Sequence, residues 1–103
     1  MKIHNDPRVD KQIRKLPEKE SARIINNIEL FRDFGFQLSQ NYLKKLTNNV
    51  WELRPGRYRL LFGIVNDEVN IVNIFMKKTH KTPKNEIELA ENRLTQYYEA
   101  ENT

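Results

Sequence analysis

The sequence predicts an α+β fold in which an N-terminal helical hairpin precedes a small antiparallel sheet and one closing helix. Residues 6–35 carry apolar side chains at helical spacing, residues 50–77 alternate as strands do, and a second helical pattern follows residue 82. A chain of 103 residues is expected to form one domain, residues 1–103, around one core.

Two helices are expected within residues 6–35. Asp6 followed by Pro7 is typical of a helix start, and the next proline is expected to end that helix at Leu16. A second helix is expected to run to Gly35, which suits a C-terminal cap. Its apolar stripe consists of Ile24, Ile28 and Phe31, widened by Ile25 and Phe34.

The pattern then becomes strand-like. Residues 42–46 predict a short strand, and residues 50–54, 57–65 and 69–77 predict three more, joined by short links. Such strands pair as an antiparallel meander of about three to four strands. Residues 2–4 leave open whether they add an edge strand. Thr82 followed by Pro83 predicts a capped final helix, a candidate to pack on the sheet.

Alternation along residues 57–65 separates two faces of the sheet. The core face is predicted to carry Tyr58, Leu60 and Phe62, and the opposite face Arg57, Arg59 and Leu61. Arg54 projects from the preceding strand beside Glu52, with which it is expected to pair. Arginines therefore crowd one end of the sheet, and the basic segment 77–81 is expected to approach them.

The formal charge of +4 is unevenly distributed. Residues 1–43 carry a net +2 and residues 85–103 a net −4, whereas residues 44–84 carry nine basic and three acidic side chains, a net +6. A basic block of this kind suits a polyanion such as nucleic acid. A solvated surface is the alternative.

Composition excludes several kinds of site. The chain has no cysteine, and therefore no disulfide, thiolate nucleophile or cysteine-based zinc site. Its two histidines, His4 and His80, make a poor metal set, so we expect no metal and no cofactor. No apolar run approaches the length of a membrane span, and residues 1–9 lack the apolar core of a signal peptide. We expect a cytoplasmic protein without membrane contact.

The basic block suits phosphate chemistry. Arginine presents a planar fork that matches phosphate oxygens, and lysine adds compact charge. Together they could hold an RNA backbone and stabilise the charge of a phosphorane-like transition state. Histidine titrates near neutrality and could transfer protons. The candidate catalytic residues are Arg54, Arg59, Lys78, His80 and Lys81. The candidate RNA-binding residues are Lys44, Lys45, Arg57, Lys77 and Lys84.

Two segments carry a family resemblance. They are YLKKLTNNVWELRPGRYRLLF at residues 42–62 and NIFMKKTHKTPKNEIELAENRL at residues 73–94. Together with the helical hairpin, they make the chain similar to the RelE/HigB-type toxins of bacterial type II toxin–antitoxin systems, within the phage-associated HigB-like branch. The most specific parts are Lys45-Leu46, Glu52-Leu53-Arg54, Tyr58-Arg59, and the run Phe75 to Pro83 followed by Glu86 and Ala90.

The resemblance implies a reduced barnase-like fold and an endoribonuclease, an mRNA interferase that cuts messages in the ribosomal A site. The implied reaction is metal-independent attack of a 2′-hydroxyl on the adjacent phosphate. The implied partners are the ribosome, mRNA and a helix-turn-helix, HigA-like antitoxin, and operator DNA is contacted only through the antitoxin complex.

The resemblance also assigns roles to individual residues. Arg54 and Arg59 match the sheet arginines that hold the phosphate, and Lys77, Lys78 and Lys81 fall in the basic segment that adds phosphate contacts or the general acid. His80 stands where close relatives often carry glutamine. The general base is left open. Two other functions also remain open, namely a non-enzymatic toxin of the same fold that poisons DNA gyrase and a plain nucleic-acid-binding module.

Overall fold

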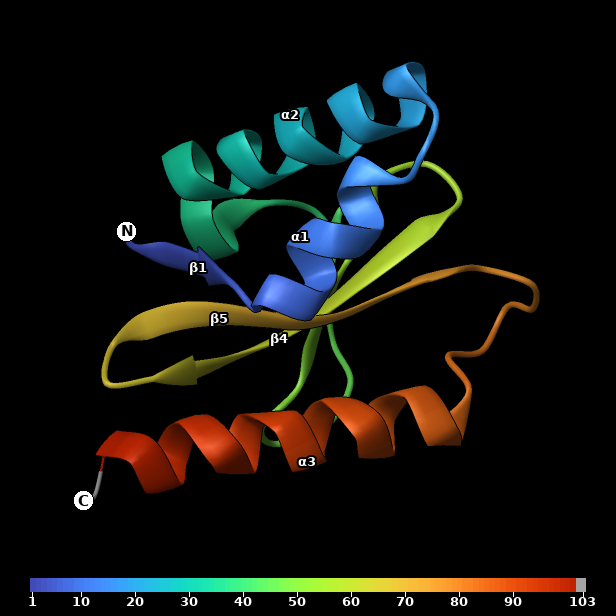
Figure 1. The fold of residues 1–103 in the computed structure, drawn as a ribbon. Coiled ribbons are helices and arrows are strands. Elements are labelled where there is room, and N and C mark those ends of the chain that lie inside the picture. Colours follow the sequence, from blue (N-terminus) through green and yellow to red (C-terminus); the bar gives the residue numbers. More distant parts are fainter. Residues whose placement is uncertain (102–103) are drawn as a thin grey trace.

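A five-stranded sheet lies between two helical layers in the computed structural model, which describes residues 1–101 (Figure 1). Along this part of the chain the elements are β1 (Ile3–Asn5), α1 (Pro7–Arg14), α2 (Glu18–Phe34), the 3-10 helix η1 (Gly35–Gln37), β2 (Leu43–Lys45), β3 (Trp51–Leu53), β4 (Tyr58–Val65), β5 (Glu68–Met76) and α3 (Lys84–Glu101). The expected α+β class is confirmed. The four strands expected between residues 42 and 77 agree with β2 to β5 within one residue at each end.

The sheet is larger than the expected meander of three to four strands. Its order is β1-β5-β4-β3-β2, and β2 to β5 pair antiparallel as predicted. However, β1 pairs parallel with β5, with Ile3 opposite Val69, so the sheet is mixed. The N-terminal segment covers the outer edge of β5 before the chain turns into α1, and the Asp6 N–H donates to the Ile71 carbonyl at 2.8 Å.

The helices α1 and α2 cover one face of the sheet. Asp6 caps α1 as predicted, because its carboxylate accepts from the Arg8 N–H at 2.8 Å, and Gly35 caps α2 with a φ of +60°. Ile24, Ile28 and Phe31 of α2 pack onto the expected core face of Tyr58, Leu60 and Phe62. The predicted widening of the α2 stripe is wrong, since Ile25 and Phe34 are 46% and 57% exposed.

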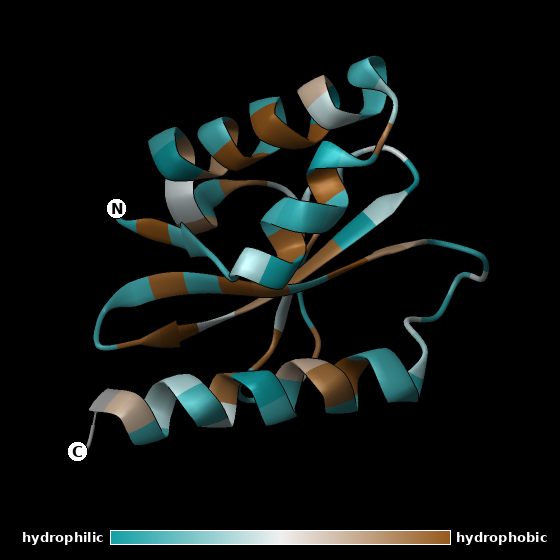
Figure 2. Ribbon diagram, viewed as in Figure 1, coloured by the Kyte–Doolittle hydropathy of each residue, from teal (hydrophilic) through white to brown (hydrophobic). Residues whose placement is uncertain are grey.

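Helix α3 covers the opposite face, so the sheet is buried on both sides. Leu61 was expected on an outer, arginine-bearing face, but it is fully buried against Ala90 and Leu94. Figure 2 shows apolar segments in β4 and β5 and in the helices on both sides of them. Within residues 1–101, no helix combines the length and apolarity needed to cross a bilayer.

A close approach between α3 and β4 depends on Gly63. A Cβ atom at this position would lie 2.6 Å from Leu94 Cδ1 and 2.9 Å from the backbone oxygen of Asn49. Because the second contact is to backbone, rotation of a side chain cannot relieve it. We expect Gly63→Ala to lower the free energy of unfolding by about 1–3 kcal/mol, measured by urea denaturation. A loss below about 0.5 kcal/mol would show that both α3 and the backbone at Asn49 yield easily to the added methyl group.

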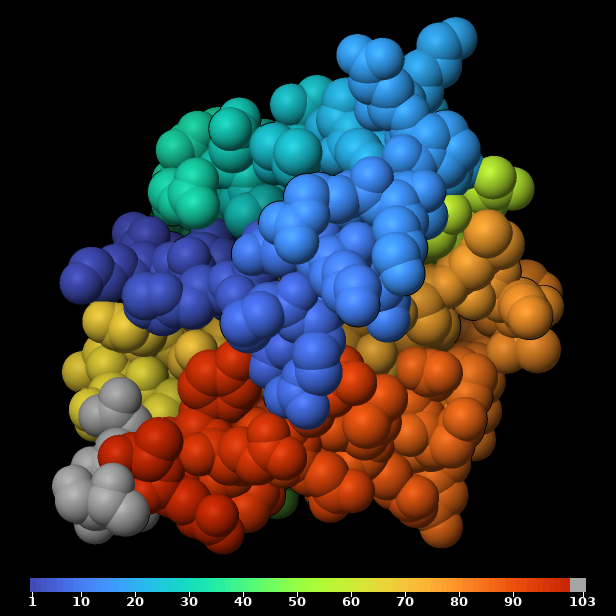
Figure 3. All heavy atoms as spheres, viewed as in Figure 1, coloured from blue at the N-terminus to red at the C-terminus, as the bar shows by residue number. Residues whose placement is uncertain are grey.

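The start of α1 and the second half of α3 are joined through a buried carboxylate. Asp6 is 3% exposed and accepts from Arg8 Nε and Nη2, both at 2.8 Å, and from the Tyr97 hydroxyl at 2.7 Å. Arg8 also donates to Gln96 at 3.2 Å. In Figure 3, atoms of α1 lie directly against atoms of α3. The contact therefore ties together the two helical layers at the β5 side of the sheet.

This contact makes the stability of the fold dependent on pH. The Arg8 hydrogen bond is the main reason that the pKa of Asp6 lies well below its ordinary value of 3.8, whereas burial and the Asp6 contact raise the pKa of Tyr97 to about 12. A lowered carboxyl pKa stabilises the folded state above about pH 4, and this contribution is lost as the pH falls. We expect Asp6→Asn to be less stable than the parent at pH 7 and to lose less stability between pH 4 and pH 2.

The pH dependence is measured by urea unfolding at each pH. Because Asp6→Asn has one fewer titrating group, the slope of its free energy of unfolding against pH is smaller than that of the parent by up to about 1.4 kcal/mol per pH unit. Asp33→Asn, which changes an exposed carboxylate on α2, is the matched control. Parallel pH profiles for Asp6→Asn and the parent would contradict the assignment.

Candidate active site

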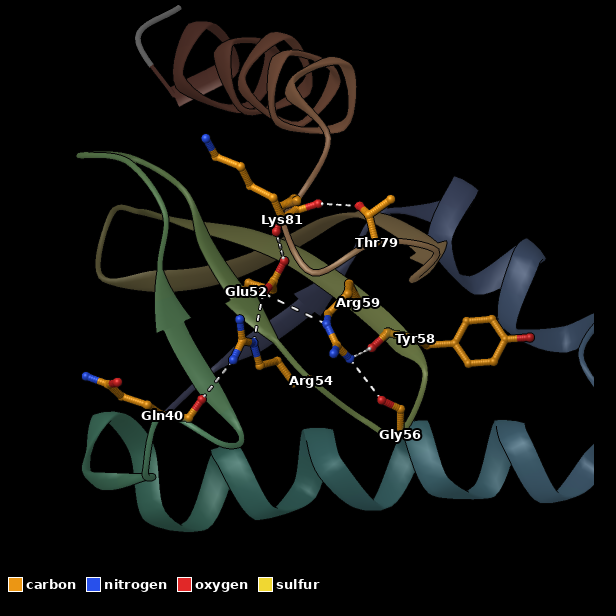
Figure 4. Close-up of polar contacts among 9 residues, drawn as sticks. Gln40, Glu52, Arg54, Gly56, Tyr58, Arg59, Thr79 and Lys81 are labelled. Atoms are coloured by element: carbon orange, nitrogen blue, oxygen red, sulfur yellow. Dashed lines mark hydrogen bonds and ion pairs between the residues drawn. The ribbon is translucent and has the colours of Figure 1, made fainter.

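A buried carboxylate lies at the centre of the arginine-rich end of the sheet. Glu52 on β3 is fully buried and points to the α3 side, because Trp51 and Leu53 occupy the opposite face. Its Oε1 accepts from Arg54 Nε at 2.9 Å and lies 4.0 Å from Arg59 Nε, and its Oε2 accepts from the Thr82 hydroxyl (Figure 4). One carboxylate thus holds two arginines and the segment that leads into α3.

The two arginines are fixed by further contacts to backbone carbonyls. Arg54 Nη1 donates to the Gln40 carbonyl at 3.2 Å, and Arg59 Nη1 donates to the carbonyls of Gly56 at 2.9 Å and Tyr58 at 2.7 Å. Their side chains are 24% and 11% exposed. Burial lowers the pKa of Arg59 from its ordinary value of 12.5. Both guanidinium groups are therefore held in position before any ligand arrives, as electrostatic catalysis requires.

Arg54 lines a basic hollow of about 330 Å³, here called the Arg54 groove. Its lining residues are Lys44, Lys45, Leu46, Arg54, His80, Lys81, Thr82 and Ile87. Four of them are cations and none is a carboxylate, while the leucine and isoleucine provide apolar surface. The groove thus combines charge suited to a phosphate with surface suited to a sugar or base.

A second hollow, of about 550 Å³, lies on the α2 side of Arg59 and is here called the α2 pocket. Its lining residues are Glu20, Arg23, Pro55, Gly56, Arg57, Tyr58, Arg59 and Lys77. The structure thus divides the predicted site residues between two neighbouring hollows. Two of the predicted site residues lie outside both hollows. Lys78 lines a separate hollow near Phe75 and Met76. Lys84 is exposed, and its Nζ lies 3.8 Å from Glu88 Oε1.

The prediction that Arg57 shares a face with Arg59 is wrong. Arg57 precedes β4, and its guanidinium turns toward α2, where Nε donates to Glu20 Oε1 at 2.9 Å. The Tyr58 hydroxyl donates to the other Glu20 oxygen at 2.8 Å. These contacts, with Tyr58 the larger influence, lower the pKa of Glu20, and Glu20 raises the pKa of Arg57. The arginines that converge are therefore Arg54 and Arg59.

Thr82 has a different role from the predicted one. Pro83, and not Thr82, is the N-cap of α3, because its carbonyl accepts from the N–H groups of Glu86 and Ile87. The Thr82 hydroxyl is therefore available to Glu52. Sequence reasoning found the pairing of Glu52 with Arg54 but missed the contact with Thr82, since the path of the loop before α3 leaves no periodic signal.

A hydrogen bond from a side chain to a backbone carbonyl lies within the basic segment before α3. The Thr79 hydroxyl donates to the Lys81 carbonyl at 2.7 Å, and the Lys81 side chain extends from the loop toward α3 (Figure 4). His80 is exposed and lines the Arg54 groove. Among the described residues, no three His, Cys, Asp or Glu side chains are grouped as a metal site would need. The pair Arg54 and Arg59 is held by hydrogen bonds and ion pairs, whereas the lysines of the groove and His80 are exposed.

This fold, with two helices on one face of a mixed sheet and one helix on the other, is similar to that of RelE toxins. A chain of the archaeal RelE-RelB complex from Pyrococcus horikoshii OT3 is similar with a TM-score of 0.62 and 16% identity, over 74% of this chain and 93% of that chain. The isolated Escherichia coli RelE toxin gives a TM-score of 0.57 at 15% identity, over 90% and 97% of the two chains. A chain of the RelB-RelE complex from Methanococcus jannaschii is similar with a TM-score of 0.53 and 17% identity, over 71% of this chain and 88% of that chain.

The family is shown by sequence. Residues 11–95 match the family described as "Phage derived protein Gp49-like (DUF891)", and the chain therefore belongs to the Gp49-like family. No curated protein sequence gives a significant match. Family and fold confirm the resemblance to RelE-type toxins, whereas the HigB-like branch stays a prediction.

Proposed function

We propose that this protein is the toxin of a type II toxin–antitoxin module and that it cleaves mRNA, most effectively on translating ribosomes. The Gp49-like family and the RelE-type fold support the toxin assignment. Two of the similar structures are complexes of RelE with RelB, which supports an antitoxin partner. We propose that this partner is a helix-turn-helix, HigA-like protein that also binds the operator.

The observation that carries the nuclease proposal is a pair of preorganised guanidinium groups that share the Glu52 carboxylate. Arg54 lines a groove without a lining carboxylate among the described residues, and Arg59 lines the neighbouring hollow. In the proposed reaction, the 2′-oxygen of a ribose attacks the adjacent phosphorus and the bond from phosphorus to the 5′-oxygen breaks. The products are a 2′,3′-cyclic phosphate and a 5′-hydroxyl. Negative charge increases on the non-bridging oxygens, and Arg54 and Arg59 stabilise it.

Two protons must move in this reaction. One leaves the attacking 2′-hydroxyl and one is delivered to the departing 5′-oxygen. His80 and Lys81 line the groove beside Arg54 and are the proposed groups for these transfers. Lys44 and Lys45 line the same groove and are proposed to hold flanking RNA. The high density of arginine and lysine favours the nuclease over a gyrase-binding toxin of the same fold.

Expression of the chain in a bacterial host tests this proposal. We expect growth arrest together with new transcript ends, which are mapped with translating ribosomes present and after translation has been blocked. Loss of the ends after the block would indicate cleavage on the ribosome. A DNA-damage response with intact transcripts would instead favour the gyrase poison, and binding to RNA without toxicity or cleavage would favour a plain binding module.

A further inference from the structure

The α2 pocket is a second basic site, distinct from the Arg54 groove. It lies where the first turns of α2 meet the turn between β3 and β4 and the end of β5, and its volume is about 550 Å³. Arg59 lines this pocket and is linked through Glu52 to Arg54, which lines the groove. The two hollows are therefore neighbours along one end of the sheet.

The pocket carries a large excess of positive charge. Its lining includes four cations and one carboxylate, a net charge of +3. The carboxylate of Glu20 already accepts from the Tyr58 hydroxyl on one oxygen and from Arg57 on the other. Glu20 also interacts electrostatically with Arg23, but one carboxylate cannot balance four cations, and a concave surface of this sign concentrates anions.

Arg23 is exposed at the rim of this pocket. Within the described part of the chain, its guanidinium makes no hydrogen bond and no ion pair. It lies against Gly56, where a Cβ atom would be 2.8 Å from Arg23 Nη1, so the glycine leaves the space that the guanidinium occupies. Sequence reasoning missed Arg23 because it is one of several exposed basic residues in the two N-terminal helices.

We propose that the α2 pocket binds a second phosphate of the same RNA strand, with Arg23 and Lys77 as its contacts. A guanidinium whose N–H groups make no hydrogen bond within the described residues, and an ammonium in the same pocket, suit a phosphodiester. This inference rests on the proposed function and extends it to the class of substrate. A strand with several phosphates would occupy both hollows, whereas a dinucleoside monophosphate has only one phosphate and would occupy one.

Salt-dependent binding of a non-cleavable RNA tests this inference. The probe is a single-stranded 2′-O-methyl oligonucleotide, and its affinity is measured over a range of salt concentrations for the parent, Arg23→Gln and Arg32→Gln. Arg32 is an exposed arginine on the same helix, outside the α2 pocket. Loss of one phosphate contact reduces the slope of log affinity against log salt by about 0.7 for single strands. We expect this change, and an affinity lower by about tenfold at low salt, only for Arg23→Gln.

The possible outcomes separate the two claims. Equal slopes for Arg23→Gln and Arg32→Gln overturn the inference, while the proposed function stands if the parent still cleaves RNA. A parent that shows no salt-dependent binding overturns the inference, and it overturns the proposed function as well if that parent cleaves no RNA. Thermal unfolding of Arg23→Gln is expected to stay close to the parent, since this exposed guanidinium makes no hydrogen bond or ion pair within residues 1–101 and only an electrostatic interaction with Glu20 would be lost. Lys77→Gln provides a second test and is expected to reduce the slope by a similar amount.

Discussion

Arg59→Ala is expected to abolish growth arrest and to reduce RNA cleavage by about 10²–10³-fold. Arg59 is 11% exposed, and its guanidinium is held by two backbone carbonyls beside Glu52. Removal of one preorganised group that stabilises transition-state charge costs a factor of this size in other enzymes. The measurement is the initial rate of cleavage of a defined RNA by purified protein, with growth arrest after induction as the readout in cells.

Two further variants show whether the effect arises at the site. Arg32→Ala removes an exposed arginine from α2 and is expected to leave toxicity unchanged. Arg59→Lys keeps the positive charge but lacks the fork that binds two oxygens, so an intermediate rate is expected. Because Arg59 also bonds to backbone, the folded state of each variant is checked by urea denaturation. A folded Arg59→Ala protein with full toxicity would overturn the assignment of the site.

Glu52→Ala is expected to destabilise the fold by about 3–5 kcal/mol, the largest effect on stability that we predict. The substitution removes the partner of Arg54 and Thr82 and leaves the half-buried charge of Arg59 without its nearest carboxylate. Loss of one partner from a buried ion pair leaves the other charge uncompensated. The free energy of unfolding is measured by urea denaturation at neutral pH.

Glu88→Ala is the matched control for Glu52→Ala. Glu88 lies 3.8 Å from Lys84 on the exposed face of α3, and exposed pairs of this kind contribute at most about 1 kcal/mol. Glu52→Gln keeps the shape of the side chain and an acceptor oxygen but lacks the charge, so an intermediate loss is expected. A loss below about 1 kcal/mol for Glu52→Ala would mean that Glu52 does not hold the arginines.

Most of the fold could be predicted from local sequence signals. Near neighbours in the sequence determine the cap at Asp6, the end of α2 at Gly35 and the positions of the strands along residues 42–77, and each agrees with the structure. Two features depend on distant contacts and were not predicted. The parallel pairing of β1 with β5 rests on three residues, and the burial of Leu61 depends on where α3 packs.

The candidate site was only partly accessible from sequence for the same reason. Strand alternation predicted that Arg54 and Arg59 crowd one end of the sheet. In the structure Arg59 of β4 lies 4.0 Å from Glu52 of the neighbouring, antiparallel β3. Alternation failed for Arg57, which precedes β4 and is drawn to Glu20, a residue 37 positions earlier. The contact between Thr82 and Glu52 spans 30 positions and depends on the loop before α3.

The most direct test of the central claim, that the arginine pair of this fold cleaves RNA, is the chemistry of the ends that the protein produces. A defined message on translating ribosomes is incubated with purified parent or Arg59→Ala in the presence of a metal chelator, and the new ends are analysed. The parent is predicted to leave a 2′,3′-cyclic phosphate and a 5′-hydroxyl, and Arg59→Ala to leave neither. Intact message with the parent, or ends carrying a 3′-hydroxyl and a 5′-phosphate, would contradict the proposed reaction.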